Sequence, residues 1–408
     1  MMEKPILRAL ASTMPSLIEQ SFKINFRILK ITAFYPPTKN KRLNQMLAFV
    51  LYMLFVVSVP ILEVLNLVLQ EKITFKQIID NAFMIAELGC LIPKYWPFVR
   101  NNDRLVKCIH YFDSPAFQPT KKKHREILQN CVKVCRAITI FFVAAVSSGY
   151  VSWSSRPISW KNHIFPTDLW LPYDPKVAPK LYNFLVYTYL VIAVGYSAYN
   201  NATIDPLISG LSYQATSQIK ILKDNLQHLG EDTEAEFNQQ SVINRLPKSE
   251  IMYRKIVKCV EHHNLILDFV KEFQYCFAQC AFSQIAGSVV VLCVSCLQLT
   301  IVDLLSFDCL AMILFLVSML SEVYFFCHFG TLLYEESSTI SDAIYMGSWY
   351  DYDKKSKQAL TILMERTKRP VIVIAGKLVQ LSLITFSMIL RRSYSLLAVL
   401  ENYNIEIN

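Results

Sequence analysis

The sequence predicts an all-α membrane protein with seven transmembrane helices. Of its 408 residues, 53% are hydrophobic and only 18% are charged, and the mean hydropathy is +0.31. Soluble domains carry about 25% charged residues, so this deficit indicates that lipid surrounds much of the chain. The 25 Phe, 21 Tyr and 5 Trp exclude a disordered chain, and nine glycines exclude a collagen-like one.

Each predicted span is a run of about 20 mostly apolar residues, the length that crosses a bilayer. In chain order the clear runs are 46–69, 131–155, 181–204, 274–302 and 307–331, followed by 372–390 with Leu396–Leu400 beyond it. The weakest run is 76–98, which Asp80, Glu87 and Pro93 interrupt. We include it because the loops on either side of it would otherwise have to share one side of the membrane.

The distribution of Lys and Arg predicts a cytoplasmic N-terminus and an extracellular C-terminus. The alternate segments 1–45, 94–130, 205–272 and 332–369 hold 8, 8, 8 and 6 basic residues, whereas the segments on the other side hold 8 in total. Basic residues in short loops mark the cytoplasmic side. This orientation is the reverse of that of a G-protein-coupled receptor.

These boundaries divide the chain into six parts. They are a cytoplasmic N-terminal segment (1–45), helices 1–4 (46–204) with a Trp- and Pro-rich outer loop at 156–180, cytoplasmic helices (205–272), helices 5–6 (273–331), a second cytoplasmic part (332–369), and a last helix with the extracellular C-terminus (370–408). Apolar residues recur at helical spacing in 205–272, with a polar break expected at Gly230–Gln240.

No enzyme, metal or cofactor motif is present in the sequence. The pair Cys293–Cys296 has zinc-type spacing but no second pair, so we interpret the cysteines as small hydrophobes. Adjacent His262 and His263 would point about 100° apart on a helix, and we expect both on a solvated face. The net charge of +9 fits the topology and attraction to acidic lipids, and we predict no nucleic-acid binding.

Ionisable residues inside predicted spans are candidates for function. Glu322 lies in the inner half of its span, and a structural hydrogen bond is favoured over an ion site. Asp80 and Glu87 are seven residues apart and share one helix face. Glu87 either lines a polar cavity or meets a partner on a neighbouring helix.

The outer half of the third span offers a possible ligand pocket. Val146, Gly149 and Trp153 share a face, so that a glycine notch lies beside an indole. Residues expected at similar depth are Tyr150, Phe184, Tyr187 and Thr188. Such a set can enclose a small apolar ligand, although helix packing alone also explains it.

The C-terminal quarter resembles the signature region of insect odorant receptors. The resemblance lies in an ordered series over about 80 residues: Phe326-Cys-His-Phe-Gly330, Ser337-Ser-Thr-Ile-Ser-Asp-Ala-Ile-Tyr345, Trp349, Met364-Glu-Arg-Thr-Lys-Arg-Pro370, Ala375-Gly376, Leu381-Ser-Leu-Ile-Thr-Phe386 and Ile389-Leu-Arg-Arg-Ser-Tyr-Ser395. The chain also matches that family in length, number of spans and inverted topology.

The resemblance implies one subunit of a tetrameric, odorant-gated, non-selective cation channel. In that family the last helix is split into a cytoplasmic part and a pore-lining part, which here would be 336–366 and 370–401, broken at Pro370. By position the gate would fall at Leu397, with Tyr394 before it and Glu401 one turn outward. Arg391 and Arg392 depart from a simple cation pore and leave this register open by about one turn.

The resemblance also implies that the odorant binds within each subunit. The pocket wall would then include Val146, Gly149, Tyr150 and Trp153, with Phe83, Met84 and Glu87 from the second span, Phe184, Tyr187, Thr188 and Val191 from the fourth, and Phe307 and Leu310 as weaker additions. Because these residues are mostly apolar, the expected ligand is a small neutral volatile.

The family contains ligand-tuning subunits and one shared co-receptor that has a long insertion between its fourth and fifth spans. The short 205–272 segment resembles a tuning subunit, which would require the co-receptor as its partner in a heterotetramer. The implied location is the plasma membrane of a sensory neuron, in its dendrite, in contact with membrane lipids. The alternatives are a gustatory-type receptor channel and a seven-span transporter or signalling receptor.

Overall fold

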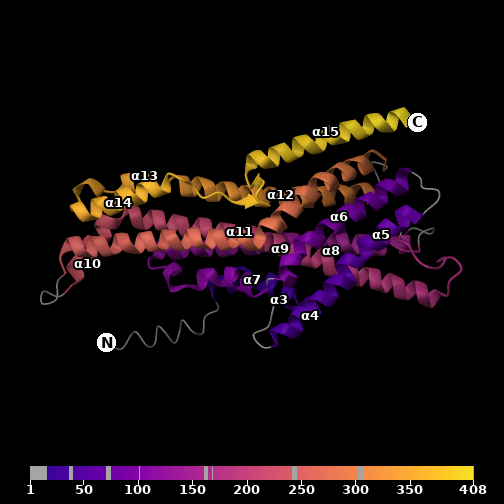
Figure 1. Ribbon diagram of the computed structural model, residues 1–408, viewed down its shortest axis with the longest axis horizontal. Coiled ribbons are helices and arrows are strands. Elements are labelled where there is room, and N and C mark those ends of the chain that lie inside the picture. The colour runs from indigo at the N-terminus through magenta and orange to yellow at the C-terminus, as the bar shows by residue number, and fades with distance from the viewer. Residues whose placement is uncertain are drawn as a thin grey trace.

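The computed structural model describes residues 16–35, 40–69, 75–100, 102–159, 164–167, 169–240, 246–301 and 307–407. The molecule is an elongated bundle in which the longest helices run along the long axis (Figure 1). The N-terminal half contains α2 (Leu17–Ser21), α3 (Lys23–Ile31), α4 (Lys41–Tyr52), α5 (Ser58–Leu69), α6 (Phe75–Arg100), α7 (Asn102–Ile109) and α8 (Lys122–Ser159). A π-helical turn, Met53–Val57, joins α4 to α5, and two short 3-10 turns, His110–Asp113 and Pro115–Phe117, follow α7.

The second half contains the longest helices and a small hairpin. It consists of α9 (Lys180–Gln227), α10 (Leu229–Gln239), α11 (Lys248–Ile301), α12 (Phe307–Ser338), α13 (Ile340–Tyr345), a 3-10 turn (Trp349–Asp351), α14 (Lys354–Thr367), β1 (Ile374–Ala375), β2 (Val379–Gln380) and α15 (Leu383–Ile407). The strands are antiparallel, and Ile374 pairs with Gln380.

Five helical elements are long and apolar enough to cross a membrane: Lys41–Leu69, Lys122–Ser155, Lys180–Gln227, Lys248–Gln298 and Met312–Tyr345. Each overlaps one of the predicted spans. Helices α6 and α15, which correspond to the second and seventh predicted spans, do not meet this measure among the described residues. Helix α6 is less apolar because it contains several charged side chains. One of them, Lys94, is completely buried in the protein.

Two helices are much longer than a bilayer is thick. With 48 and 54 residues, α9 and α11 extend roughly 72 and 81 Å at 1.5 Å per residue, against about 30 Å of hydrocarbon. Their excess length packs with α10, α13 and α14 at the left of Figure 1, and we call this part the helical extension. The ion pair Lys223–Glu336, at 2.8 Å, links α9 to α12 within it.

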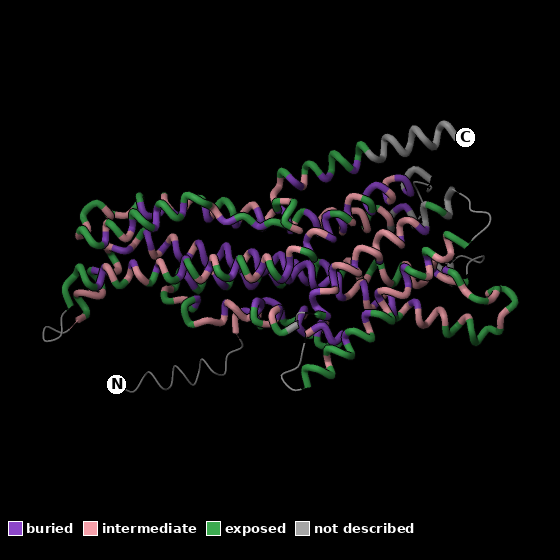
Figure 2. Tube along the Cα trace, in the orientation of Figure 1, coloured by how far each residue is buried: buried purple, intermediate pink, exposed green. Residues whose placement is uncertain are grey.

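The core follows the middle of the bundle and continues into the helical extension, as the buried segments in Figure 2 show. The N-terminal helix α3 joins this core by packing along α9. The Asn25 amide donates to the Thr203 carbonyl at 2.8 Å, and the Phe22 ring lies where a side chain at Gly210 would be. The segment before the first span is therefore part of the folded bundle.

Three details differ from the sequence-based predictions. The polar stretch Gly230–Gln240 is mostly helical, since α10 covers it as far as Gln239. Polar composition does not prevent a helix when Leu229 and Thr233 are buried against the bundle. His262 and His263 are buried, at 7% and 3% exposure, rather than solvated, because α11 has protein on both of these faces. The His262 ring contacts the Gln218 amide oxygen at 3.1 Å.

The third difference is the split in the last segment. Instead of a helix that resumes at Pro370, residues 374–380 form the β1–β2 hairpin, and α15 begins only at Leu383. The part before the split is also interrupted, because α12, α13 and α14 cover it in turn. Gly376 and Lys377 have φ of 57° and 62°, so a left-handed turn at this point reverses the chain.

Candidate functional site

An aromatic group joins the C-terminal part of α8 to the N-terminal part of α9. The Tyr150 hydroxyl donates to the Val191 carbonyl at 2.7 Å, and the Tyr187 hydroxyl donates to the Ser154 carbonyl at 2.9 Å. The Tyr150 ring lies nearly parallel to that of Trp153, with 6.4 Å between centroids. The structure thus brings together four residues of the predicted pocket wall: Tyr150, Trp153, Tyr187 and Val191.

Trp153 has a buried polar atom with no partner. Its indole Nε1 makes no hydrogen bond within the described residues. A buried Trp N–H normally finds an acceptor, because leaving a donor unpaired costs about 1–3 kcal/mol. Since the described residues provide no acceptor, this N–H is available to an acceptor on a bound molecule.

The other predicted residues on α8 and α9 differ in their surroundings. Val146 and Thr188 are partly buried. Gly149 is exposed, and no atom lies within 4 Å of the place where a Cβ would be, so the predicted notch is open space. The Phe184 ring is 63% exposed, which sets it apart from the enclosed residues of the aromatic group.

The α6 residues of the predicted pocket form a second group, which packs against α12. The Phe83 ring packs edge-on against Phe315 of α12 at 5.0 Å, and Met84 is buried. The Glu87 Oε2 atom is buried and has no hydrogen-bond partner in the described part of the chain. No hydrogen bond or ring contact between described residues links this group to Tyr150 or Trp153. The side chains of Phe307 and Leu310 lie outside the described residues.

A buried polar network, which the sequence analysis missed, lies deeper in the bundle. Lys94 was counted in a cytoplasmic loop and Asp205 in a cytoplasmic segment, but they form a fully buried ion pair at 2.6 Å. Asn201, part of an N-x-T sequence, and Gln284 of α11 bind the same ammonium group. Both amides also donate to Glu322, which therefore has the predicted structural hydrogen bonds. One feature of the sequence points to this network: Lys94 lies between Pro93 and Pro97 in an otherwise apolar helix.

The recognisable C-terminal residues build the joint between the helical extension and α15. A side chain at Gly330 would overlap the Leu381 carbonyl oxygen, so glycine allows the hairpin to lie against α12. The Gly376 N–H donates to the Ala278 carbonyl of α11 at 2.8 Å, and the Val371 N–H donates to the Ser337 hydroxyl at 2.8 Å. Gly330, Ser337 and Gly376 of the motif series thus dock one hairpin and the segment before it onto α11 and α12.

Helix α15 leaves the bundle from this joint, and its described side chains, 383–395, are mostly exposed (Figure 2). Ile384 and Tyr394 are 74% and 73% exposed, and Arg391 and Arg392 are also exposed. Leu397 and Glu401 lie on α15, but their side chains are outside the described residues. The predicted gate residues therefore lie on a helix whose described part has an exposed face.

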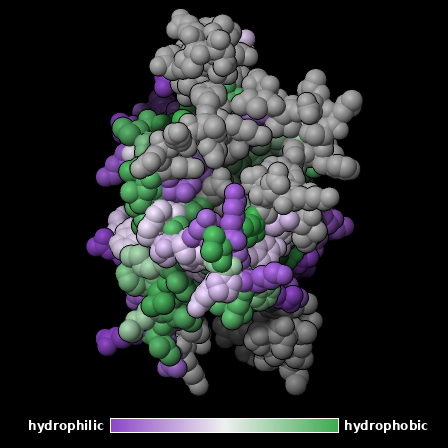
Figure 3. Space-filling model, turned by 90° about the vertical axis from the view of Figure 1, so that its right-hand side faces the viewer, coloured by the Kyte–Doolittle hydropathy of each residue, from purple (hydrophilic) through white to green (hydrophobic). Residues whose placement is uncertain are grey.

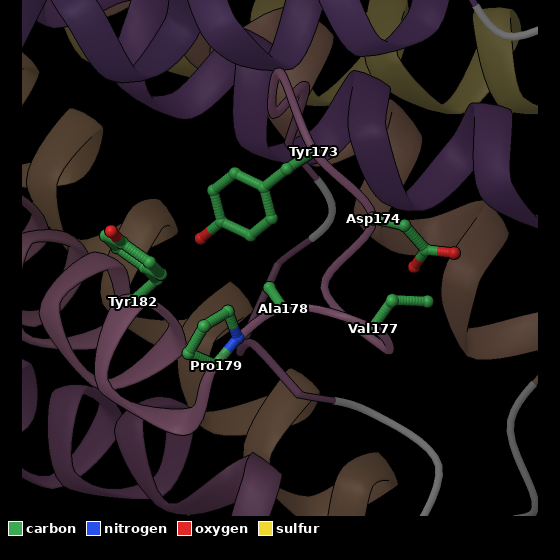
Figure 4. A pocket seen from close by; sticks show the side chains of 6 residues that line it. All are labelled: Tyr173, Asp174, Val177, Ala178, Pro179 and Tyr182. Carbon is green, nitrogen blue, oxygen red and sulfur yellow. The ribbon is translucent and has the colours of Figure 1, made fainter.

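A shallow pocket of about 580 Å³ lies at the right-hand end of the molecule, on the segment that leads into α9. It is lined by Tyr173, Asp174, Val177, Ala178, Pro179 and Tyr182. Figure 4 shows the Tyr173 ring directed toward Tyr182, with 6.4 Å between the ring centroids. The surface of this end is mixed, with hydrophobic and hydrophilic patches side by side (Figure 3). None of these residues was predicted.

The fold and these sites define a helical membrane receptor. The eleven cysteines are all free and mostly buried, as predicted for packing residues, and no group of metal-ligating side chains occurs among the described residues. The sequence profile of the 7tm Odorant receptor family matches residues 74–394. The chain therefore belongs to the insect odorant receptor family, whose members are ligand-gated channels rather than enzymes.

Individual relatives agree with this assignment. The chain is 25% identical to Odorant receptor Or1 of Anopheles gambiae over 95% of its own length and 96% of that protein. It is 29% identical to the odorant receptor coreceptor of Aedes albopictus, but over only 38% of this chain and 33% of the coreceptor. The fold matches the olfactory receptor OR5 of Machilis hrabei, solved with eugenol, with a TM-score of 0.79 at 14% identity, covering 96% and 99% of the two chains.

Proposed function

We propose that the chain is the odorant-binding subunit of a heteromeric, odorant-gated, non-selective cation channel. Its partner is the odorant receptor co-receptor, and its location is the plasma membrane of an olfactory sensory neuron, in the dendrite. Membership of the odorant receptor family supports the proposal. The observation that carries ligand binding is the buried Trp153 N–H without a partner, beside the stacked Tyr150 ring.

In the proposed topology α6 and α15 cross the membrane together with the five apolar elements, which makes seven spans. The N-terminus and the helical extension lie in the cytoplasm, and the C-terminus lies outside. Thirty of the 41 basic residues fall in the segments placed inside, as expected for cytoplasmic loops. The charged groups that weaken α6 as a span are tolerable because Lys94 and its partners are satisfied within the protein.

The proposed assembly is a heterotetramer held by the helical extension. Large apolar side chains are exposed on this part of the molecule, well beyond the bilayer. They are Tyr345, Met346, Tyr350 and Ile362, which are 61–71% exposed. Because lipid cannot cover them there, neighbouring subunits are the natural cover. Helix α15, which leaves the bundle beside this surface, would line the shared pore.

The proposed ligand is a small neutral volatile that carries a hydrogen-bond acceptor. The Trp153 N–H would bind its oxygen, while the rings of Tyr150 and Trp153 enclose its apolar part. On the α6 side, the Glu87 carboxyl is available to a hydroxyl group. A ligand that binds the open state more tightly shifts the closed–open equilibrium by the difference in affinity.

The proposed gate is the outer part of α15. Leu397 would form a ring that closes by dewetting, and Glu401 one turn outward would favour cations. Tyr394 lies about one turn before Leu397 on the same helix. Arg391 and Arg392, both exposed in the single chain, would be paired or turned toward neighbouring subunits in the assembly.

The tuning role, as distinct from the co-receptor role, is supported by the short link between α10 and α11. Only residues 240–247 separate these helices, which leaves no room for a long insertion. The coreceptor of Aedes albopictus matches over a third of its length only, whereas Or1 of Anopheles gambiae matches along nearly its whole length.

The proposal is tested by whole-cell recording in cells that express this chain with and without the co-receptor, during a panel of volatiles and with G-protein signalling blocked. A rapid cation current in the co-expressing cells alone is the expected result. Current from this chain without the co-receptor would contradict the heteromeric role. A response that the G-protein block abolishes would contradict the channel.

A further inference from the structure

Helix α3 has one face packed along α9 and one basic face turned away from the bundle. The basic face carries the exposed residues Lys23, Arg27 and Lys30, which follow one another at intervals of four and three residues. At 3.6 residues per turn this spacing places the three side chains within about 60° of one another. Ile31, the last residue of the helix, is 78% exposed and extends the same face. An apolar side chain therefore ends a row of three cations.

The charge on this basic face is not neutralised within the described part of the chain. Of the ion pairs formed by described residues, none includes the three cations of α3. The Lys30 ammonium lies 5.3 Å from the centre of the Tyr35 ring, a contact that leaves its charge uncompensated. Glu19 is the single acidic residue of α2 and α3. Arg136 of α8 adds a further cation, since its Nε donates to the Gln20 carbonyl at 2.7 Å.

Two hydrogen bonds connect this part of the chain to the inner ends of predicted spans. The Asn25 amide donates to the Thr203 carbonyl at 2.8 Å, and the fourth predicted span ends one residue later. The Asn44 amide donates to the Ala33 carbonyl at 2.8 Å, and the first predicted span begins two residues after Asn44. In the proposed topology the basic face therefore follows the boundary between lipid and cytoplasm.

The two ends of α3 lie at different depths along α9. The Phe22 ring lies against Gly210, six residues beyond the fourth predicted span. The Tyr196 hydroxyl, eight residues inside that span, donates to the Thr32 carbonyl at 2.9 Å. At 1.5 Å per residue these contacts extend from roughly 9 Å outside the span to roughly 12 Å within it. Ile31 is thus at the depth of the acyl chains, which accounts for its exposure in the single chain.

The basic side chains lie at the depth of the lipid headgroups. Lys23 and Arg27 occupy the outer turns of α3, and the long stem of Lys30 allows its ammonium group to reach the same level. A helix with a basic face and an apolar end is suited to the interface of an anionic membrane. The cytoplasmic leaflet is the one that carries anionic lipids.

We propose that Lys23, Arg27 and Lys30 bind the headgroups of anionic phospholipids in the cytoplasmic leaflet. The ammonium and guanidinium groups pair with the phosphate and carboxylate oxygens of these headgroups, and Ile31 contacts their acyl chains. Because the buried face of α3 packs along α9, bound lipid holds the N-terminal segment on the bundle. The proposal rests on the proposed orientation of the chain and not on its response to an odorant.

Hydrogen–deuterium exchange of the full-length chain in lipid nanodiscs tests the proposal. Exchange of the α3 amides is compared between nanodiscs of phosphatidylcholine alone and nanodiscs that also contain phosphatidylserine. A ligand that binds the packed helix slows exchange that requires local opening. One basic residue near an anionic surface contributes roughly a fivefold preference, so we expect phosphatidylserine to slow exchange in the wild type by at least this factor.

The test variant Lys23→Gln/Arg27→Gln/Lys30→Gln should exchange at the same rate in both kinds of nanodisc. In phosphatidylcholine alone it should match the wild type, because exposed side chains are not needed for packing on α9. The variant Lys23→Arg/Lys30→Arg keeps the charges and should keep the slowing by phosphatidylserine. Since salt screens contacts between exposed charges, high salt should diminish the slowing in the wild type, a comparison that needs no substitution.

The matched control removes three charges that lie far from the lipid. Lys122→Gln/Arg125→Gln/Lys354→Gln changes exposed residues at the starts of α8 and α14. His124, between the first two, contacts Asp224 of α9 at 3.0 Å, 21 residues beyond the α3 contact at Thr203. This is roughly 31 Å further along that helix, against a Debye length of about 8 Å. The control should therefore retain the full effect of phosphatidylserine on α3.

Several results would overturn the proposal. Equal exchange of the wild-type α3 in both kinds of nanodisc would show that no anionic lipid binds there. Slowing that persists in the glutamine variant of α3, or at high salt, would mean that these three charges are not the contact. Slowing by soluble glycerophosphoserine in phosphatidylcholine nanodiscs would indicate a site for free anions instead. Nanodiscs carry the lipid in both leaflets and no odorant is added, so a negative result leaves the proposed channel function untouched.

Discussion

The Tyr150 hydroxyl donates a hydrogen bond of 2.7 Å to the Val191 carbonyl at the point where α9 carries Gly195. A Cβ at Gly195 would lie only 2.8 Å from the Tyr150 Oη atom. The position of the tyrosine ring therefore depends on a residue of the neighbouring helix that has no side chain. Because the Tyr150 ring is stacked with Trp153, the absence of a side chain at Gly195 also affects how the indole ring is packed.

Gly195→Ala is expected to displace the Tyr150 ring and to shift the odorant dose–response curve. Overpacking of this kind costs about 1–3 kcal/mol. The measurement is the half-maximal odorant concentration at matched surface expression with the co-receptor. Adding Tyr150→Phe, which removes the nearest atom, should recover part of the loss. Gly149→Ala meets open space and serves as the control; an equal effect of both alanines would refute the steric explanation.

Trp153→Phe is expected to weaken the response to odorants that carry an acceptor oxygen. The change keeps an aromatic ring but removes the N–H, and one neutral hydrogen bond contributes about 0.5–1.5 kcal/mol, roughly a threefold to tenfold change in half-maximal concentration. Hydrocarbon odorants should be affected much less. Phe184→Ala, at a 63% exposed position, is the control. Equal losses for both odorant classes would show that the N–H is not a ligand contact.

Gly330→Ala is expected to disturb the docking of the β1–β2 hairpin on α12. The new methyl group would overlap the Leu381 backbone, which cannot move without the hairpin. We expect a loss of about 1–3 kcal/mol, measured as a lower midpoint of thermal unfolding of the detergent-purified chain. Gly89→Ala on α6 meets no atom within 4 Å, so this variant should unfold like the wild type.

Asp353→Ala is expected to loosen the start of α14. The Asp353 carboxylate accepts a hydrogen bond from the Ser356 N–H at 3.2 Å, and loss of such an N-cap costs about 1 kcal/mol. Faster hydrogen exchange confined to the first turn of α14 is the readout. Asp351→Ala, at an exposed residue outside the helix, should leave this exchange unchanged. Unaltered exchange in Asp353→Ala would mean that water replaces the cap.

Leu397→Ala is expected to raise the basal current of the channel formed with the co-receptor. A smaller side chain at a hydrophobic constriction admits water more readily. The measurement is the odorant-independent current relative to the maximal odorant response. Tyr394→Phe retains the bulk of the preceding turn and provides the comparison. Wild-type basal current and permeability in Leu397→Ala would place the gate elsewhere on α15.

The sequence predicted those features of the fold that depend on local apolar length. The span predicted at 307–331 lies within α12, which begins at Phe307, and the span predicted at 274–302 falls on α11, which ends at Ile301. Hydropathy succeeds here because a lipid-facing helix must be apolar over its whole length. Hydropathy was a weak guide to α6, whose buried charge Lys94 finds its partners on α9 and α11 rather than within its own helix.

Features that depend on partners distant in the sequence were missed. Lys94 was read as a loop residue because its acceptors are 107–190 residues away. His262 was expected on a solvated face because no local pattern reveals that Phe117 and Gln218 cover it. In the candidate site, helical spacing predicted only the face of Val146, Gly149 and Trp153, whereas the 63% exposure of Phe184 depends on where the neighbouring helices lie.

Helix α9 is continuous from Lys180 to Gln227, even though it contains Pro206. It carries Tyr187 and Val191 of the aromatic group, Asp205 of the buried network and Asp224, which pairs with Lys123 at 2.6 Å in the helical extension. A rotation of this helix about its own axis displaces all three regions at the same instant. Three regions that lie far apart along the bundle are therefore coupled mechanically through one continuous helix, α9.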